Sequence, residues 1–301
     1  MFRGFIFRGA VFAVFLLACD GFAQVSSRSV SLSGERALKA DIEVGALKLI
    51  LTSHSAPSVF RYEFDADDTT TLQCLYDIRN GVGYLELHNN SQDKNRKKKF
   101  RLRDLFGGED DEDTEHGRRS NAILRLSLTD SIPIHLDLTV GAANTELDFS
   151  GLKLSNFSLS SGACAAKVRF KTPNRVTMQQ MKLSTGASKL IVEGLGNANF
   201  ERLEMSGGAS DVVLDFDGKG CPAAKANLSI GAGSLRIILP PTLDVDLNYS
   251  NDFFSTFRVP DAFEKNGDTY ILRSTNGANN LKMNVSSGMG SVRIKLKGEE
   301  K

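Results

Sequence analysis

Paired acidic side chains are the first residues whose types and spacing could do chemistry. Asp215 and Asp217 lie two residues apart, and Asp137 and Asp148 form a second candidate pair. Two carboxyl groups facing one sugar ring are what a polysaccharide hydrolase requires, because one protonates the leaving oxygen while the other acts as base or nucleophile. Outward acidic residues are also usual on any solvated strand. We therefore predict no catalytic site and keep a polysaccharide-active enzyme as the alternative.

Metal-ligand patterns are absent from the sequence. Residues 207–212 lack the glycine and aspartate of a calcium-binding nonapeptide, and residues 65–70 lack the glycine and terminal glutamate of an EF-hand loop. The histidines are scattered and show no ligand spacing. No metal site and no cofactor is predicted. The histidines are His54, His88, His116 and His135.

Serine and asparagine recur with a period rather than in a single cluster. Ser184, Ser206 and Ser229 each stand shortly before a glycine, which favours turn and ladder residues over a nucleophile. Three Asn-x-Ser sequences share one strand position before the turn, so repetition explains them better than glycosylation does. They begin at Asn227, Asn248 and Asn284.

A repeat of about 22 residues organises the second half of the chain. Leu-Ser-x-Gly-Ala segments recur, and from the residue numbers the first five turn glycines are spaced 21, 24, 22 and 23 residues apart. Each turn is followed by a second apolar pair, so each repeat supplies two strands of period two. The predicted structural turn residues are Gly141, Gly162, Gly186, Gly208, Gly231 and Gly288.

Such repeats predict a β-solenoid, because one repeat cannot hide its apolar face from water and stacking like on like does so. Turns repeated in register require either a positive φ or a close backbone approach, and both favour a missing or small Cβ. Residues 247–252 fit a degenerate copy with Asn or Asp at the left-handed position. Residues 258–281 are interpreted as a hairpin that leaves the stack. The repeat domain is assigned to residues 121–297.

Upstream, residues 25–88 contain further strand-like runs and are interpreted as the N-terminal all-β part of the same stack, with a separate small sheet as the other interpretation. Residues 89–120 carry a basic block followed by an acidic block, a pattern typical of a solvated, disordered insert. The functional interpretation of that insert is a basic arm for anionic lipid or cell-wall polymer. The other is a flexible loop between repeats.

The first residues have the pattern of an export signal. Arg3 and Arg8 precede the apolar run 9–18, which suits a signal peptide and is too short to span a bilayer. Two cleavage sites stay open. Signal peptidase I would remove residues 1–23, whereas a lipobox would remove residues 1–18 and make Cys19 the lipidation site. The predicted location is the periplasm or the cell surface, with a lipid anchor in the second case.

Composition agrees with this class. The 301 residues are 41% hydrophobic, enough for a substantial core, and 27 glycines without any tryptophan favour many short strands. The formal charge of +1 becomes zero when two arginines and one aspartate leave with residues 1–23, so no argument for nucleic acid remains. Export would permit one disulfide among Cys74, Cys164 and Cys221 and would leave one thiol.

With these Gly-Ala repeats, and with residues 193–203 between two of them, the sequence resembles the toast-rack and LiaF-like C-terminal domains of cell-wall-active antibiotic response proteins. It is similar also to the related "putative adhesin" repeats. The likeness covers residues 36–296 apart from the charged insert. It implies a β-solenoid at the cell envelope, in a class with no catalytic residues to carry over. Members tied to envelope-stress signalling have transmembrane helices before the domain, whereas a signal peptide precedes it here.

The leading hypothesis is an exported structural or binding module, adhesin-like or linked to envelope stress. It would contact an envelope protein or a cell-wall or matrix polymer through an outward strand face or through the hairpin at 258–281. The alternatives are the polysaccharide-active β-helix enzyme and a sensor subunit that restrains an envelope-stress kinase.

Overall fold

The computed structural model describes most of the chain between residues 24 and 298. The predicted export signal with Cys19, residues 92–120 of the charged insert, residue 121 and Cys221 lie outside the described residues. Among the described residues, no helix is both long and apolar enough to cross a membrane. The described ranges are 24–55, 57–67, 70–91, 122–219, 223–251, 254–274 and 280–298.

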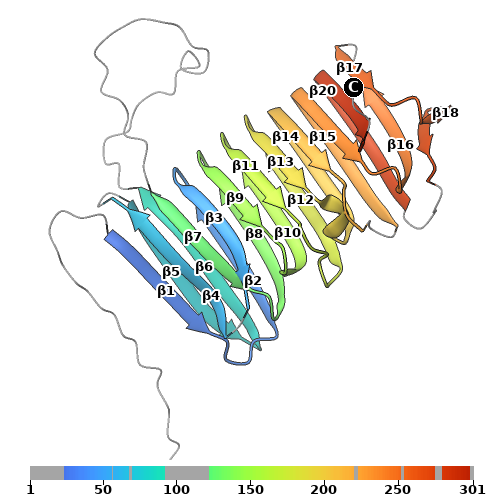
Figure 1. Ribbon diagram of the computed structural model, residues 1–301. Coiled ribbons are helices and arrows are strands. Elements are labelled where there is room, and N and C mark those ends of the chain that lie inside the picture. Colours follow the sequence, from blue (N-terminus) through green and yellow to red (C-terminus); the bar gives the residue numbers. More distant parts are fainter. Residues whose placement is uncertain are drawn as a thin grey trace, which may run out of the picture.

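The chain winds as a β-solenoid, in which each turn of the coil, here called a rung, gives one strand to each of two series of paired strands (Figure 1). The first sheet contains, in spatial order, β5 (Thr70–Arg79), β6 (Val82–Ser91), β2 (Ala37–Val44), β8 (Pro133–Val140), β10 (Lys153–Ser161), β12 (Met178–Thr185), the first parts of β14 (Phe200–Asp215), β15 (Ala224–Leu239) and β20 (Asn280–Leu296), then β16 (Asp244–Asn251), β19 (Thr269–Leu272) and β18 (Glu264–Asn266).

The second sheet completes the rungs. It contains β1 (Gln24–Ser31), β4 (Ser58–Ala66), β7 (Ile123–Thr129), β3 (Lys48–His54), β9 (Asn144–Asp148), β11 (Ala165–Arg169), β13 (Lys189–Glu193), the later parts of β14, β15 and β20, and β17 (Ser255–Arg258). Because β14, β15 and β20 run through the corner without a break, the two sheets form one hydrogen-bonded network. The all-β solenoid predicted from the repeats is confirmed.

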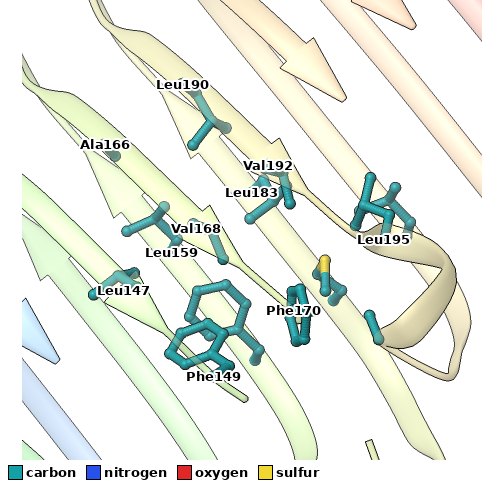
Figure 2. Close-up of a cluster of buried hydrophobic side chains, with 14 of the residues drawn as sticks. Leu147, Phe149, Leu159, Ala166, Val168, Phe170, Leu183, Leu190, Val192 and Leu195 are labelled. Carbon is teal, nitrogen blue, oxygen red and sulfur yellow. The ribbon is translucent and has the colours of Figure 1, made fainter. Parts of the chain in front are cut away.

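Alternation of apolar and polar residues builds the core. From Met181 to Thr185 in β12, and along β13, every second side chain is buried and points between the sheets, while the others face outward. Figure 2 shows Leu147 of one rung in one cluster with Leu159 and Val168 of the next rung. Phe149 packs edge-to-face against Phe157, with ring centroids 4.8 Å apart. All belong to a single hydrophobic core that runs along the stack.

Close backbone approach is what the Gly-Ala corners require. A Cβ on Gly288 would come 2.8 Å from the carbonyl oxygen of Gly231, and one on Gly141 would come 3.3 Å from the Cα of Gly45. The six turn glycines have no positive φ, so the left-handed conformation is not the reason for glycine at these corners. The left-handed conformation does explain a glycine elsewhere, since Gly194 adopts a φ of 77° before the short 3₁₀ turn η2 (Leu195–Asn197).

The order of the rungs in space differs from their order in the sequence. The rung formed by β2 and β3 lies between the β6–β7 rung and the β8–β9 rung. At the other end, β20 is inserted between β15 and the β16–β17 rung (Figure 1). Both ends of the repeat domain are therefore held on two sides, which a simple sequential stack does not provide.

The predicted hairpin at 258–281 differs from the expectation in one respect. The chain does turn back at Asn266–Gly267 between β18 and β19. However, β19 pairs antiparallel with β16, so the hairpin extends the first sheet instead of leaving the stack. The degenerate copy lies in register with the others, with Ser250 opposite Ser286.

β6 ends at Ser91 and β7 begins at Ile123. These two strands pair with β2 and β3, whose own corner is Gly45–Ala46. The backbone N–H of Gly45 donates to the Oδ1 atom of Asn89 at 2.5 Å. Cys74 and Cys164 are free thiols.

Candidate functional site

Three asparagines form a hydrogen-bonded row on the outward side of the first sheet. Asn227 on β15, Asn284 on β20 and Asn248 on β16 are exposed and directly opposite one another. The Nδ2 atom of Asn248 donates to Oδ1 of Asn284 at 3.2 Å, and Nδ2 of Asn284 donates to Oδ1 of Asn227 at 2.9 Å. Thr269 begins the row, since its hydroxyl donates to Oδ1 of Asn248 at 2.7 Å.

All these hydrogen bonds run in one direction, so each amide polarises the next. The Nδ2 group of Asn227 ends the row and has no hydrogen-bond partner within the described part of the chain. Asn227 lies opposite Glu204 of β14. The row therefore presents a free amide donor beside a carboxylate acceptor, on a surface open to solvent.

A second row consists of serine hydroxyls, two residues further along each strand. Ser206, Ser229 and Ser286 are opposite one another on β14, β15 and β20. The hydroxyl of Ser206 donates to that of Ser184 at 3.3 Å. Hydroxyls can both donate and accept, so this row complements the amides with small, adaptable polar groups.

The hairpin of β18 and β19 closes one end of a groove that runs over these rows. Lys265 and Asp268 come from this hairpin, and the Lys265 Nζ lies 5.5 Å from the centre of the Tyr270 ring. The groove has a volume of about 800 Å³. Its ionisable side chains other than tyrosine are two lysines and two acids, which balance in formal charge. The lining side chains include Lys182, Glu204, Asn227, Asn248, Lys265, Asp268, Tyr270 and Asn284.

The carboxylate pairs do not lie in this groove. Asp215 ends β14 at the far corner, where its Oδ1 atom accepts the backbone N–H of Asp217 at 2.9 Å. Burial raises the pKa of Asp215. A hydrogen bond from Lys297 lowers the pKa of Asp217.

The second candidate pair is not brought together. Asp137 lies on β8 of the first sheet and Asp148 on β9 of the second. The Oδ2 atom of Asp137 lies 3.0 Å from Nε2 of His135, whereas the Oδ2 atom of Asp148 lies 2.5 Å from Nζ of Lys171. Each carboxylate therefore has a separate partner.

The histidines are also separate within the described residues, where no three His, Cys, Asp or Glu side chains gather around a possible metal position. His54 contacts the hydroxyl of Ser58 at 2.8 Å. Ser58 is only 4% exposed, so this serine cannot meet a substrate. Burial lowers the pKa of His54, which favours the neutral ring.

The sequence carried a signal for the asparagine row. The three Asn-x-Ser sequences share one strand position, and this shared position is what puts the amides in register. Their contact was not inferred because the insertion of β20 between β15 and β16 was not visible in the periodicity. Without that insertion, Asn284 would not lie between Asn227 and Asn248.

The fold and the outward rows define a β-solenoid with polar ladders and a hairpin at one end. The family model described as the N-terminal domain of toast_rack, DUF2154, matches residues 20–179, more than half of the chain. The chain belongs to this family, as the repeats indicated. No curated protein matches it.

Several solved structures are similar to the chain over nearly its whole length. A "putative cell adhesion protein" from Clostridium sporogenes ATCC 15579 is 14% identical, with 91% of this chain and 100% of that chain covered and a TM-score of 0.47. A "putative lipid binding protein" from Parabacteroides distasonis ATCC 8503 is 11% identical, with coverage of 92% and 98% and a TM-score of 0.39. A "putative adhesin" from Bacteroides fragilis NCTC 9343 is 10% identical, with coverage of 90% and 97% and a TM-score of 0.33.

Proposed function

We propose that the chain is an exported, non-catalytic binding module of the bacterial cell envelope, adhesin-like in its role. In this proposal the groove on the first sheet binds a neutral polysaccharide in an extended conformation. Residues 1–23 would direct export, with Cys19 as the lipid-bearing residue if the lipobox is used.

The single observation that carries this proposal is the one-way row of amides from Thr269 to Asn227. Sugar hydroxyls donate and accept at once, and the free Nδ2 group of Asn227 beside Glu204 offers both partners. Neighbouring strands repeat at about 4.8 Å, so the groove presents the same groups at a regular spacing. A linear polymer of repeating units can use such a surface along its length.

Charge supports a neutral ligand. Lys182 and Lys265 balance Glu204 and Asp268 in the groove. A strongly anionic polymer would gain little electrostatic binding energy in this groove, because two acids offset the two lysines and salt screens the exposed charges. Tyr270 adds apolar area at the hairpin end, which is the kind of surface that carbohydrate rings cover.

The test is binding of the purified chain to a panel of neutral cell-wall and matrix glycans. Replacing the central amide, Asn284→Ala, removes two hydrogen bonds of the row and should weaken the affinity roughly tenfold. Asn144→Ala is the matched control, because Asn144 is an exposed asparagine on β9 of the second sheet. Equal affinities of both variants, or no binding to any neutral glycan, would contradict the proposal.

A second candidate, the polysaccharide-active enzyme, is favoured by one observation. The pKa values of Asp215 and Asp217 are displaced in opposite directions, the first by burial and the second by Lys297. An acid and a base arranged in this way are what glycoside hydrolysis requires. Release of reducing ends from a glycan, lost in Asp215→Asn, would favour this candidate over the binding module.

A further inference from the structure

The C-terminal end of the second sheet repeats one outward pattern on adjacent rungs. In β20 the outward side chains at positions 289, 291 and 293 are apolar, hydroxyl-bearing and arginine, in that order. The same order is found at positions 254, 256 and 258, in β17 and just before it. Thr256 lies opposite Ser291, and Arg258 lies opposite Arg293. We call this surface the C-terminal grid. Its six outermost members are Met289, Ser291, Arg293, Phe254, Thr256 and Arg258.

A third rung continues the grid. On β15, Ser234 lies opposite Ser291 and Arg236 lies opposite Arg293, so three arginines stand side by side on three neighbouring strands. All three arginines are exposed. Within the described residues none of them takes part in an ion pair. Like charges directly opposite one another are unfavourable in a sheet, so folding alone gives no reason for this row.

Elsewhere on the same sheet, two outward lysines are paired with acids. Lys48 pairs with Glu146 at 3.1 Å, and Lys167 pairs with Glu193 at 2.6 Å. Each of these two lysines has an anion on a neighbouring strand. The arginine row differs from these pairs, since the residue opposite Arg236 on β14 is Val213.

The apolar row of the grid is the second observation. Phe254 is 80% exposed and Met289 is 61% exposed, and they are two of the five large hydrophobic side chains that are exposed in the described residues. They stand at the corner, four residues before Arg258 and Arg293, or about 13 Å along the strands. Exposed apolar side chains beside unpaired arginines have the composition of a surface that meets a membrane.

We propose that the C-terminal grid docks on the surface of an anionic lipid bilayer. Phe254 and Met289 enter the boundary between headgroups and acyl chains, and the arginine row binds lipid phosphates through bidentate hydrogen bonds. Arginine stems are long enough to reach toward the headgroups from the sheet. The hydroxyls of Ser291 and Thr256 lie between the two rows and can donate to the same phosphates. This surface is on the second sheet, apart from the groove on the first, and the inference does not depend on the proposed function.

The test is co-sedimentation of residues 24–301, which contain every described strand, with vesicles. Vesicles of phosphatidylcholine containing phosphatidylglycerol are compared with vesicles of phosphatidylcholine alone. Binding should require phosphatidylglycerol and should fall roughly 100-fold when the three arginines of the row are replaced by glutamine. Replacing Phe254 and Met289 by serine should also weaken binding, because apolar insertion is lost.

The matched control is a triple variant of the first sheet, in which Arg202, Lys225 and Lys282 are replaced by glutamine. These residues are likewise exposed, opposite one another and on neighbouring strands, so the change in net charge is the same. Equal weakening by both triple variants, or no preference for phosphatidylglycerol, would overturn the proposal. So would binding of soluble polyphosphate as tight as vesicle binding, with no effect of the Phe254 and Met289 changes, since the site would then be one for a soluble polyanion.

Discussion

Gly186 lies against Gly162 so closely that a Cβ on Gly186 would come 2.9 Å from the carbonyl oxygen of Gly162. The N–H of Ala187 donates to the same oxygen at 3.0 Å. The carbonyl is therefore held by the ladder and cannot move aside without loss of a hydrogen bond. The spacing of adjacent rungs depends on this contact.

Gly186→Ala should consequently destabilise the protein by about 1–3 kcal/mol, the usual cost of overpacking a site that cannot relax. The measurement is chemical unfolding of the purified variant. Gly45→Ala is the matched control at an equivalent corner, because a Cβ there would meet only the side chain of Asn89 at 3.7 Å. That control should change stability by less than about 0.5 kcal/mol. Equal losses in both variants would show that close approach is not the reason for glycine at the corners.

The core makes a second prediction. Phe149 contacts both Phe157 and Phe170 edge-to-face, with ring centroids 4.8 Å and 5.4 Å away (Figure 2). Phe149→Ala should cost about 3–5 kcal/mol, because it leaves a cavity between two rungs. Phe254→Ala makes the same change at a side chain that is 80% exposed and should cost less than about 0.5 kcal/mol. Thermal and chemical unfolding of the two variants give the comparison, and similar losses would contradict the inward position of the Phe149 side chain.

Local pattern was enough to predict the rungs. Leu-Ser-x-Gly-Ala at Gly162 and Gly186 marks a strand, a corner and a second strand, and the structure has β10, β11, β12 and β13 in that order. This works because period-two alternation and close packing at a corner are properties of neighbouring residues. The sequence cannot decide whether these glycines serve a positive φ or a close backbone approach, because it contains no φ angles.

The order of the rungs could not be predicted. Each rung presents nearly the same apolar face, so the face of β16 fits β15 as well as it fits β20 by composition alone. Pairing of Leu228 with Val285, and of Tyr249 with Val285, is a property of the whole stack. The asparagine row depends on that pairing, so the groove cannot be predicted from the sequence, although the sequence shows the shared position of its asparagines.

The inserted position of β20 makes a third prediction, about dynamics. Terminal segments usually fray, but β20 is paired with β15 on one side and with β16 and β17 on the other. Its backbone amides should therefore exchange with deuterium as slowly as those of β15, measured by mass spectrometry of peptides. β18 is the internal comparison, since all three of its residues are exposed and it pairs only with β19. Exchange in β20 as fast as in β18 would contradict the inserted topology.

The same strand makes a fourth prediction, about pH. Lys297, just after β20, hydrogen-bonds the carboxylate of Asp217, and this bond lowers the pKa of Asp217 in the folded state. A carboxyl group whose folded pKa is depressed stabilises the protein above its unfolded pKa, near 3.9 for aspartate, and that contribution is lost as the pH falls through the folded value. Asp217→Asn should therefore be less stable than the native chain at pH 7, and the difference should shrink below about pH 4.

The control for this last prediction is Lys297→Met, alone and combined with Asp217→Asn, in unfolding measurements across the acid range. If the ion pair is the cause, Lys297→Met should return the pKa of Asp217 toward its ordinary value, and the double variant should be no less stable than the less stable single variant. Both side chains are about half exposed, at 47% for Asp217 and 50% for Lys297, so added salt should reduce the effect. A stability difference that stays constant from pH 7 to pH 2 would show that Asp217 acts through its backbone turn and not through its charge.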